Sequence, residues 1–542
     1  MTQPLLEVDG LTVRLPPGAD RLNAVEDASF TLSANEILCI VGESGSGKSL
    51  TAAAVMGLLP RPGVSATQGR IQFEGEDLLA LSESRMRQIR GQRIAMIFQE
   101  PMSALNPVMR IGEQVAEVLE AHGNPSAAEA HARVLELLAA VGLPDPTLLA
   151  ETYPFRLSGG QRQRVMIAIA LALNPAILIA DEPTTALDVT TQAQILDLIR
   201  SIQAERQMGV LFITHDFGVV ADIAQRVAVM QHGRIVEQGD KRTVLDHPSH
   251  AYTRSLIAAV PRLKPPAPRM LDGAPVVLSA QGLRKIYRSG GGFFRPHRVV
   301  EAVKNVSLTI RKGETLGLVG ESGSGKTTVG RCLVRLIEAD GGAISFHGVD
   351  LRRLTRRALR PYRQRIQMVF QDPYASLNPR HKVGHIIMAG PRAFGATQAE
   401  ASIRAAELLR LVGLDPASAE RYPHEFSGGQ RQRIGVARAL ALDPELLVAD
   451  EPVSALDVSV QAQILDLLDD IRRRLDLAML FITHDLRVAA QICDRVAVMH
   501  KGEIVEEGPT AGIFGDPRHA YTQTLIASIP GKDWTASAAT NG

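Results

Sequence analysis

The sequence contains a long internal repeat. GESGSGK occurs at 42–48 and again at 320–326, and SGGQRQR occurs at 158–164 and again at 427–433. The shorter motifs DEP, THD and HAYT recur at the same offset as SGGQRQR. A repeat of this length predicts two copies of one domain. Each copy is long enough to bury a core of its own.

Proline-rich sequence separates the two copies. Residues 261–275, PRLKPPAPRMLDGAP, contain five prolines and a glycine, which disfavour both helices and sheet hydrogen bonds. This segment is predicted to link a first domain over 1–260 to a second over 276–530. The remaining residues, 531–542, hold the only tryptophan and little else that is apolar, so they are expected to form a disordered tail.

Charge and cysteine content exclude several classes of protein. Lys plus Arg total 59 and Asp plus Glu total 58, a net charge of +1, so the chain has no overall basic field to hold nucleic acid. Cys39, Cys332 and Cys493 are far apart and match no metal or disulfide spacing, so we expect reduced core residues. The first residues, MTQPLLEVDG, lack the features of a signal peptide, and no uncharged run reaches the ~20 residues that span a bilayer. We expect no transmembrane helix.

Short apolar runs that end at polar motifs are typical of buried parallel strands. Such runs predict strands in the first copy at 36–41, 93–98, 176–180, 210–214 and 226–230. The corresponding runs in the second copy lie at 365–370, 445–449, 478–483 and 495–499. Between Gln99 or Gln371 and the next SGGQ, apolar residues follow helical spacing. The sequence therefore predicts an α/β core with a helical insert in each copy.

Both copies contain the pattern G-x-x-x-x-G-K-[ST] after an apolar run, which predicts a phosphate-binding loop. Its backbone N–H groups face the phosphates, the lysine reaches the β- and γ-phosphates, and the hydroxyl binds magnesium. The first loop consists of Gly42, Glu43, Ser44, Gly45, Ser46, Gly47, Lys48 and Ser49. The second consists of Gly320, Glu321, Ser322, Gly323, Ser324, Gly325, Lys326 and Thr327. Two matches in register predict two nucleotide sites.

Two adjacent carboxylates follow a later apolar run in each copy, Asp181 with Glu182 and Asp450 with Glu451. Adjacent residues point in opposite directions from a strand. This pattern favours one carboxylate, the aspartate, in the magnesium shell and the other, the glutamate, as the group that polarises an attacking water. Solvated carboxylates at a strand end are the alternative.

These residues closely resemble the ATP-binding cassette (ABC) ATPases, in two copies over nearly the whole chain. The resemblance implies two tandem P-loop NTPase cassettes, each with a RecA-like α/β core and a helical insert subdomain. In that family, SGGQ opens a helix that caps the γ-phosphate bound to the opposite cassette. The matching residues are Ser158, Gly159, Gly160 and Gln161, and Ser427, Gly428, Gly429 and Gln430.

The resemblance also implies further site residues. Gln99 and Gln371 match the glutamine of the Q-loop, which contributes to the metal site with Ser49, Thr327, Asp181 and Asp450. His215 and His484 match the switch histidine. These positions imply ATP hydrolysis with Mg²⁺ at both sites.

Two flanking patterns narrow the resemblance to the oligopeptide, dipeptide and nickel permease group. They are FQEPMSALNP and FQDPYASLNP after the Q-loop glutamine, and HPSHAYTRSLIAAVP and DPRHAYTQTLIASIP late in each copy. The chain resembles a fused form that powers peptide uptake, with separate partners: two transmembrane permease subunits and an extracytoplasmic binding protein. The resemblance implies a peripheral location at the cytoplasmic face of the inner membrane and head-to-tail pairing of the two cassettes. Many members carry a cysteine cluster after the HPYT segment, but none is present here, so no iron–sulfur cluster is expected.

Soluble tandem-cassette proteins that act on ribosomes or DNA are the alternative. They usually carry a long charged linker, zinc-binding cysteines or a basic surface, which this sequence lacks.

The two copies differ in two respects. Tyr287 lies where the family stacks an aromatic residue on adenine, whereas the first copy has Leu15 there. A basic run in the second copy is matched more sparsely in the first. It consists of Arg352, Arg353, Arg356, Arg357, Arg360, Arg363 and Arg365, against Arg85, Arg87, Arg90 and Arg93. This run indicates either a solvated face or contact with anionic lipid headgroups or a permease loop.

Overall fold

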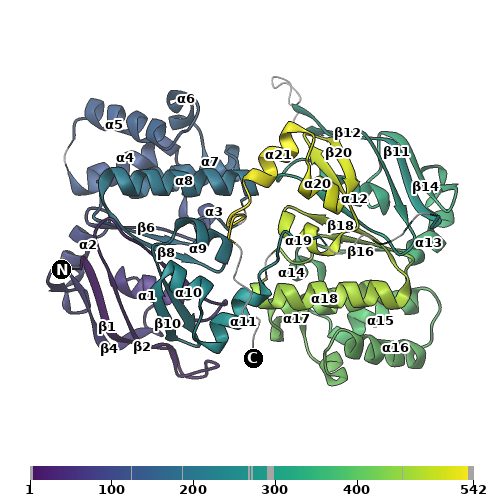
Figure 1. Cartoon of the computed structure of the whole chain (residues 1–542), viewed down its shortest axis with the longest axis horizontal. Helices are drawn as coiled ribbons and strands as arrows, with labels where there is room; N and C mark the ends of the chain where they lie inside the picture. The colour runs from purple at the N-terminus through teal and green to yellow at the C-terminus, as the bar shows by residue number, and fades with distance from the viewer. Residues whose placement is uncertain are drawn as a thin grey trace. The chain divides into compact units, whose positions relative to one another are not determined.

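The computed structural model describes residues 4–123, 125–185, 187–265, 269, 271, 273–289, 298–454 and 456–534. The chain forms two compact units, one made of 1–260 together with 530–542, the other of 261–529. Figure 1 shows an α/β arrangement within each. None of the described helices is long and apolar enough to cross a membrane.

The first unit contains two sheets. Its strands are β1 (Leu6–Arg14), β2 (Asn23–Leu32), β3 (Ile37–Val41), β4 (Ser65–Phe73), β5 (Glu76–Asp77), β6 (Ile94–Ile97), β7 (Ile177–Asp181), β8 (Gly209–Thr214), β9 (Arg226–Gln231) and β10 (Arg234–Asp240). One sheet is antiparallel, in the order β2-β1-β4-β5, and the other is in the order β10-β9-β3-β8-β7-β6. In the second sheet all neighbouring strands are parallel except β10, which pairs antiparallel to β9.

The described residues of the first unit also form α-helices. They are α1 (Lys48–Val55), α2 (Glu83–Ile89), α3 (Pro101–Ala104), α4 (Ile111–His122), α5 (Ala127–Ala140), α6 (Pro146–Ala150), α7 (Gly159–Leu171), α8 (Val189–Arg206), α9 (Phe217–Ile223), α10 (Lys241–Asp246) and α11 (Ala251–Ala259). Helices α4, α5 and α6 pack on one another and on α7, as Figure 1 shows. This group is the predicted helical insert.

The second unit repeats the same plan. Its strands are β11 (Val276–Ser289), β12 (Arg298–Arg311), β13 (Thr315–Val319), β14 (Gly341–Phe346), β15 (Val349–Asp350), β16 (Ile366–Val369), β17 (Leu446–Asp450), β18 (Ala478–Thr483), β19 (Arg495–His500) and β20 (Glu503–Pro509). The sheet orders are β12-β11-β14-β15 and β16-β17-β18-β13-β19-β20. Its helices are α12 (Lys326–Leu333), α13 (Arg356–Arg365), α14 (Pro373–Ser376), α15 (Val383–Ala393), α16 (Gln398–Leu411), α17 (Gly428–Leu440), α18 (Val458–Leu475), α19 (Leu486–Ile492), α20 (Thr510–Gly515) and α21 (Ala520–Ala527).

The central strands are apolar on both faces because helices cover both sides of a parallel sheet. Every residue of β3, β7 and β8 is buried, and so is every residue of β13, β17 and β18. The predicted strands of both parallel sheets are confirmed within one or two residues. Cys39, Cys332 and Cys493 are buried and free, which confirms their assignment to the core.

The prediction of a disordered tail is wrong for residues 531–534. The Gly531 amide donates to Asp222 (2.9 Å), and the Trp534 indole N–H donates to Asp246 (3.3 Å). The Trp534 ring also packs against the apolar core of the first unit. Low apolar content favours disorder, but one large aromatic ring with a polar partner is enough to hold a short segment. Residues 535–542, and linker positions 266–268, 270 and 272, lie outside the described residues.

Candidate functional site

The phosphate-binding loops lie between a buried strand and a helix, as predicted. In the first unit the loop follows Val41 of β3, and α1 begins at Lys48. Gly47 precedes α1 with φ 109°, a conformation that side chains rarely adopt. No side chain caps this helix, nor α12 in the second unit. The first backbone N–H groups of both helices therefore point at the place where an anion would bind.

The loop lysines bridge their own loops. Lys48 Nζ donates to the carbonyls of Gly42 (2.8 Å) and Glu43 (2.9 Å). Lys326 Nζ donates to those of Gly320 (2.6 Å) and Glu321 (2.8 Å). Both lysines are buried. Each ammonium is thus held over the concave side of its loop, in position to exchange a carbonyl for a phosphate oxygen.

In each unit the hydroxyl and the aspartate expected to hold magnesium are in contact, whereas the Q-loop glutamine bonds the neighbouring glutamate. Asp181 ends β7, next to β8, and accepts a hydrogen bond from Ser49 Oγ (3.1 Å). Burial raises the pKa of Asp181 to about 6, although the bond from Ser49 lowers it. In the second unit Thr327 Oγ1 donates to Asp450 Oδ1 (2.9 Å), and burial again raises the pKa of the aspartate.

The second oxygen of Asp450, Oδ2, is buried and has no hydrogen-bond partner among the described residues. The Ser324 hydroxyl in the nearby loop is also buried and unpaired. Buried polar groups normally have partners, so these two atoms match a site built for a ligand. An oxygen-rich set of hydroxyl and carboxylate fits a hydrated Mg²⁺, and the hydroxyl of Ser324 fits a phosphate oxygen.

Glu182 is the centre of a hydrogen-bonded group formed from three strand ends. Its carboxylate accepts bonds from Gln99 Nε2 (3.0 Å) and Thr185 Oγ1 (2.9 Å), and lies 3.2 Å from His215 Nδ1. In the second unit Glu451 accepts from Gln371 Nε2 (2.8 Å) and lies 3.2 Å from His484 Nδ1. Both glutamates have φ 46°, an uncommon backbone conformation that tends to occur at functional sites.

The charges of this group are linked. Burial raises the pKa of Glu182, but the hydrogen bond and charge of His215 outweigh it, so the pKa falls to about 2. Burial alone would lower the pKa of His215. The hydrogen bond and the charge of Glu182 raise it by more, so the pKa of His215 lies above its usual value. The pKa of Glu451 is lowered and that of His484 raised for the same reasons. In each cassette the carboxylate thus favours the protonated form of the imidazole that it faces, and the imidazole favours the ionised carboxylate.

The SGGQ motifs begin α7 and α17. Ser158 Oγ accepts from the Gln161 amide (3.2 Å), and Gln161 Oε1 accepts from the Ser158 amide (2.9 Å). The same capping box joins Ser427 and Gln430. The second glycine serves packing, because a Cβ on Gly160 would lie 2.5 Å from a methyl of Thr191 in α8. A Cβ on Gly159 would meet only Leu187, at 3.7 Å, so the first glycine has room beside it.

Two functional residues were not predicted from sequence. The Tyr252 hydroxyl accepts from the Glu43 amide (3.3 Å) and donates to the Glu43 carboxylate (3.2 Å). The Tyr521 hydroxyl accepts from the Glu321 amide (3.2 Å). Both tyrosines belong to the repeated HAYT motif, which was the signal available. Tyr287, the expected adenine residue, lies in β11 and is 40% exposed.

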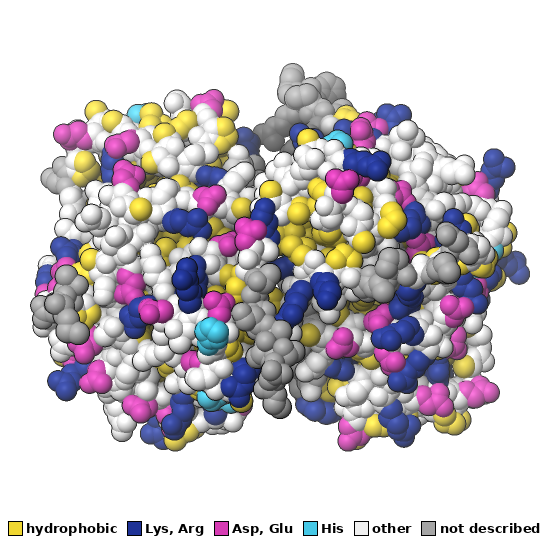
Figure 2. Space-filling model, in the orientation of Figure 1, with side chains coloured by type: hydrophobic (Ala, Val, Ile, Leu, Met, Phe, Trp, Pro, Cys, Tyr) yellow, Lys and Arg dark blue, Asp and Glu magenta, His cyan; other side chains and the backbone are white. Residues whose placement is uncertain are grey.

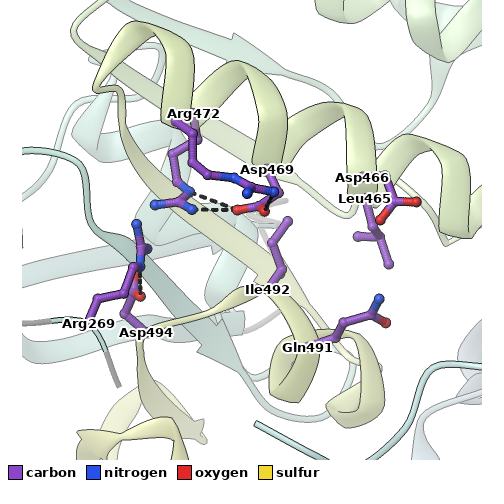
Figure 3. Close-up of a pocket in the computed structure, with 9 residues that line it drawn as sticks. Arg269, Leu465, Asp466, Asp469, Arg472, Gln491, Ile492 and Asp494 are labelled. Carbon is purple, nitrogen blue, oxygen red and sulfur yellow. Dashed lines mark hydrogen bonds and ion pairs between the residues drawn. The ribbon is translucent and has the colours of Figure 1, made fainter. Parts of the chain in front are cut away.

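A separate cavity of about 230 Å³ lies in the second unit between α18 and the turn after α19 (Figure 3). Two ion pairs lie in its lining: Arg472 Nε donates to Asp469 (3.1 Å), and Arg269 Nε donates to Asp494 (2.7 Å). The lining includes no residue of the phosphate-binding motifs. We assign this cavity no role in nucleotide binding.

Comparison with known proteins identifies the family. The family model described as "ABC transporter" matches residues 25–185 and 303–454. A second, "Oligopeptide/dipeptide transporter, C-terminal region", matches 236–283 and 505–540.

Curated relatives match almost the full chain. The peptidoglycan transport ATP-binding protein YejF of Agrobacterium fabrum is 49% identical over 97% of this chain and 96% of its own. The glutathione import ATP-binding protein GsiA of Salmonella paratyphi A is 48% identical over 98% of this chain and 90% of its own. A solved dimeric ATP-binding cassette with ADP and Pi is 28% identical, with a TM-score of 0.40, over 43% of this chain and 98% of its own. The chain belongs to the ABC transporter family and is an ATPase with two cassettes on one polypeptide.

Proposed function

We propose that this chain powers the uptake of peptides, of the dipeptide or oligopeptide class, through separate permease subunits. The observation that carries the proposal is the intact group of carboxylate, amide and imidazole in both cassettes, Glu182 with Gln99 and His215 in the first. A complete group in each cassette supports ATP hydrolysis at both nucleotide sites. The match to the oligopeptide/dipeptide region and the names of the relatives, which concern peptide-containing compounds, support the substrate class.

In each cassette, the residues would divide the work of hydrolysis. The lysine and the backbone N–H groups of the loop bind the phosphates and hold the γ-phosphorus in place for attack. The glutamate orients the attacking water and accepts its proton as the bond to the leaving ADP oxygen breaks. With a pKa of about 2, Glu182 is ionised at neutral pH, which is the form that can accept this proton. The histidine and glutamine fix the position of the carboxylate.

Magnesium, when bound, would neutralise charge on the β- and γ-phosphates. Ser49, Asp181 and Gln99 would hold it in the first cassette, and Thr327, Asp450 and Gln371 in the second. The buried, unpaired Asp450 Oδ2 supports this assignment.

The two cassettes would pair head to tail. Lys48 would face Ser427 across one ATP, and Lys326 would face Ser158 across the other. ATP would close the pair and hydrolysis would open it. The helical inserts would pass this motion to two permease chains at the cytoplasmic face of the membrane, supplied by an extracytoplasmic binding protein.

Purification from membranes tests the proposal. A tagged full-length chain, extracted from its native membranes in detergent, should bring down two hydrophobic permease chains in equal amounts. Addition of the binding protein with a peptide should then increase ATP hydrolysis by the reconstituted complex. A Glu182→Gln/Glu451→Gln chain should assemble equally well and hydrolyse little. Recovery of ribosomes or DNA in place of permeases would overturn the proposal.

A further inference from the structure

Helix α13 of the second cassette has an exposed face made of arginines. Arg356, Arg360 and Arg363 are spaced by four and three residues and so share one side of the helix, and Arg357 borders it. All four are exposed, while Leu359 is buried beneath the helix. We name Arg356, Arg357, Arg360 and Arg363 the arginine face.

Most of this charge is not neutralised within the protein. Arg356, Arg357 and Arg363 form no ion pair with any described residue. Arg360 donates to the Ala393 carbonyl and lies over the Phe394 ring, 5.3 Å from its centroid, so it keeps its full charge. Elsewhere, on the side drawn in Figure 2, basic and acidic side chains are interspersed. The arginine face departs from that pattern.

The first cassette shows how the same helix looks when its charge is balanced. Helix α2 corresponds to α13: Ser82 and Thr355 cap them, and Met86 and Leu359 are buried at matching positions. In α2, Glu83 pairs with Arg90 (2.5 Å) and lies 3.6 Å from Arg87. The position of Glu83 is taken by Arg356 in α13.

Arginine in place of glutamate at this position is unfavourable for the helix. A carboxylate in the first turn of a helix is favoured by the helix dipole, whereas arginines there are opposed by it. Helix α2 has Glu83 in its first turn, and α13 has Arg356 and Arg357 with no acidic residue. The folded cassette gains nothing from them, which points to a negatively charged partner outside the described part of the chain.

We propose that the arginine face binds the headgroups of anionic phospholipids. None of the four guanidinium groups is fixed by a hydrogen bond to an acidic side chain of the described residues, and Arg360 donates only to a carbonyl. Long, mobile cations in an open array suit a diffuse negative surface better than one shaped acidic loop. The contact adds membrane affinity to whatever the permease subunits provide, and it exists in the second cassette only.

Vesicle binding by the purified full-length chain tests this inference without any permease. The chain should float with vesicles that contain phosphatidylglycerol and stay behind with pure phosphatidylcholine, and high salt should release it. Arg356→Glu/Arg357→Ser, which installs the residues of α2, should lower the partition coefficient at least about 25-fold, since each arginine contributes about fivefold.

A matched control has the same change of charge elsewhere. Arg70→Glu/Arg410→Ser alters two exposed arginines outside α13 and should leave the partition coefficient within about twofold of the parent. Both variants should keep the parental ATPase rate in solution, because neither touches the nucleotide sites. Equal losses in both variants, or equal binding to both lipids, would overturn the inference. So would a chain with Arg356→Glu/Arg357→Ser that still binds vesicles but no longer co-purifies with permeases, which would assign the face to a protein partner.

Discussion

At the scale of single residues, the proposed roles of Glu182 and Glu451 predict that ATP hydrolysis depends on their carboxylates. Changing both to glutamine keeps their shape and their bonds to Gln99 and Gln371 but removes the negative charge. We expect kcat to fall by about 10²- to 10⁴-fold, the range for loss of a general base, with ATP affinity unchanged. Steady-state hydrolysis assays measure kcat, and nucleotide titration measures the affinity for ATP. A double variant that hydrolyses ATP at the parental rate would show that neither glutamate has this role.

Tyr252 lies outside the phosphate-binding loop and contacts it through Glu43. Its hydroxyl bonds both the amide and the carboxylate of Glu43, so Tyr252→Phe should loosen the loop. The expected result is about fivefold weaker ATP binding at the first site, the usual effect of one buried hydrogen bond, with little change in kcat. Tyr521→Phe should weaken ATP binding at the second site in the same way, because the Tyr521 hydroxyl accepts a hydrogen bond from the Glu321 amide. Fluorescent-nucleotide titration, with the opposite site disabled through its lysine, separates the two. Unaltered affinity in Tyr252→Phe would contradict this role.

The two positions expected to contact adenine carry different residues, Leu15 and Tyr287. Strand pairing continues past Arg14 through the bond from the Leu15 amide to Leu22, which puts Leu15 at the position of Tyr287 in β11. Phe30, the aromatic residue nearest in sequence, is buried in the core and cannot replace it. Stacking on an aromatic ring is worth about 1 to 3 kcal/mol per base, so the first site should bind ATP at least about fivefold more weakly. Leu15→Tyr should tighten it and Tyr287→Leu should weaken the second. Equal affinities, insensitive to both changes, would refute the proposed asymmetry.

At the scale of elements, the C-terminal residues 530–534 form a strap on the first cassette. Gly531 lies against α9, where an added Cβ would come 2.7 Å from the Cα of Gly218. The repeat shows that only this cassette can accept the strap. At the positions of Gly218, Asp222 and Asp246, the second cassette has Arg487, Gln491 and Gly515, which would remove the space beside Gly531 and the acceptor for Trp534.

Removal of the strap should therefore affect one cassette. We expect Trp534→Ala to raise amide exchange in 217–246 about tenfold, equivalent to ~1.4 kcal/mol of local stability. The corresponding segment 486–515 should be unchanged and serves as the internal control. Exchange followed by mass spectrometry measures both in one sample. A uniform increase across both segments, or none in 217–246, would mean that the strap does not stabilise the first cassette in this specific way.

Sequence was sufficient for some of these elements and not for others. The parallel strands were predictable because each is an apolar run that ends at a polar motif, as in ILIADEP before Glu182. The φ of 46° at Glu182 could not be predicted, because no neighbouring residue in the sequence requires it. The bond from Tyr252 to Glu43 spans 209 residues, and the strap depends on acceptors nearly 300 residues before Trp534. Contacts of this kind depend on tertiary packing, which local pattern does not encode.

At the scale of the whole molecule, head-to-tail pairing makes a prediction about pairs of substitutions. Lys48 and Ser427 would belong to one composite site, and Lys326 and Ser158 to the other. Lys48→Ala/Ser427→Arg should then lower hydrolysis little beyond the more damaging single change, because both disable the same site. Lys48→Ala/Ser158→Arg carries the same two types of change but disables both sites, so its rate should fall at least about tenfold further. Steady-state hydrolysis rates of the three single and two double variants decide the matter. If Lys48→Ala/Ser427→Arg instead gave the lower hydrolysis rate, each SGGQ motif would act on the ATP of its own cassette. Lys48 and Ser158 would then belong to one site, and losing both would cost little more than losing one.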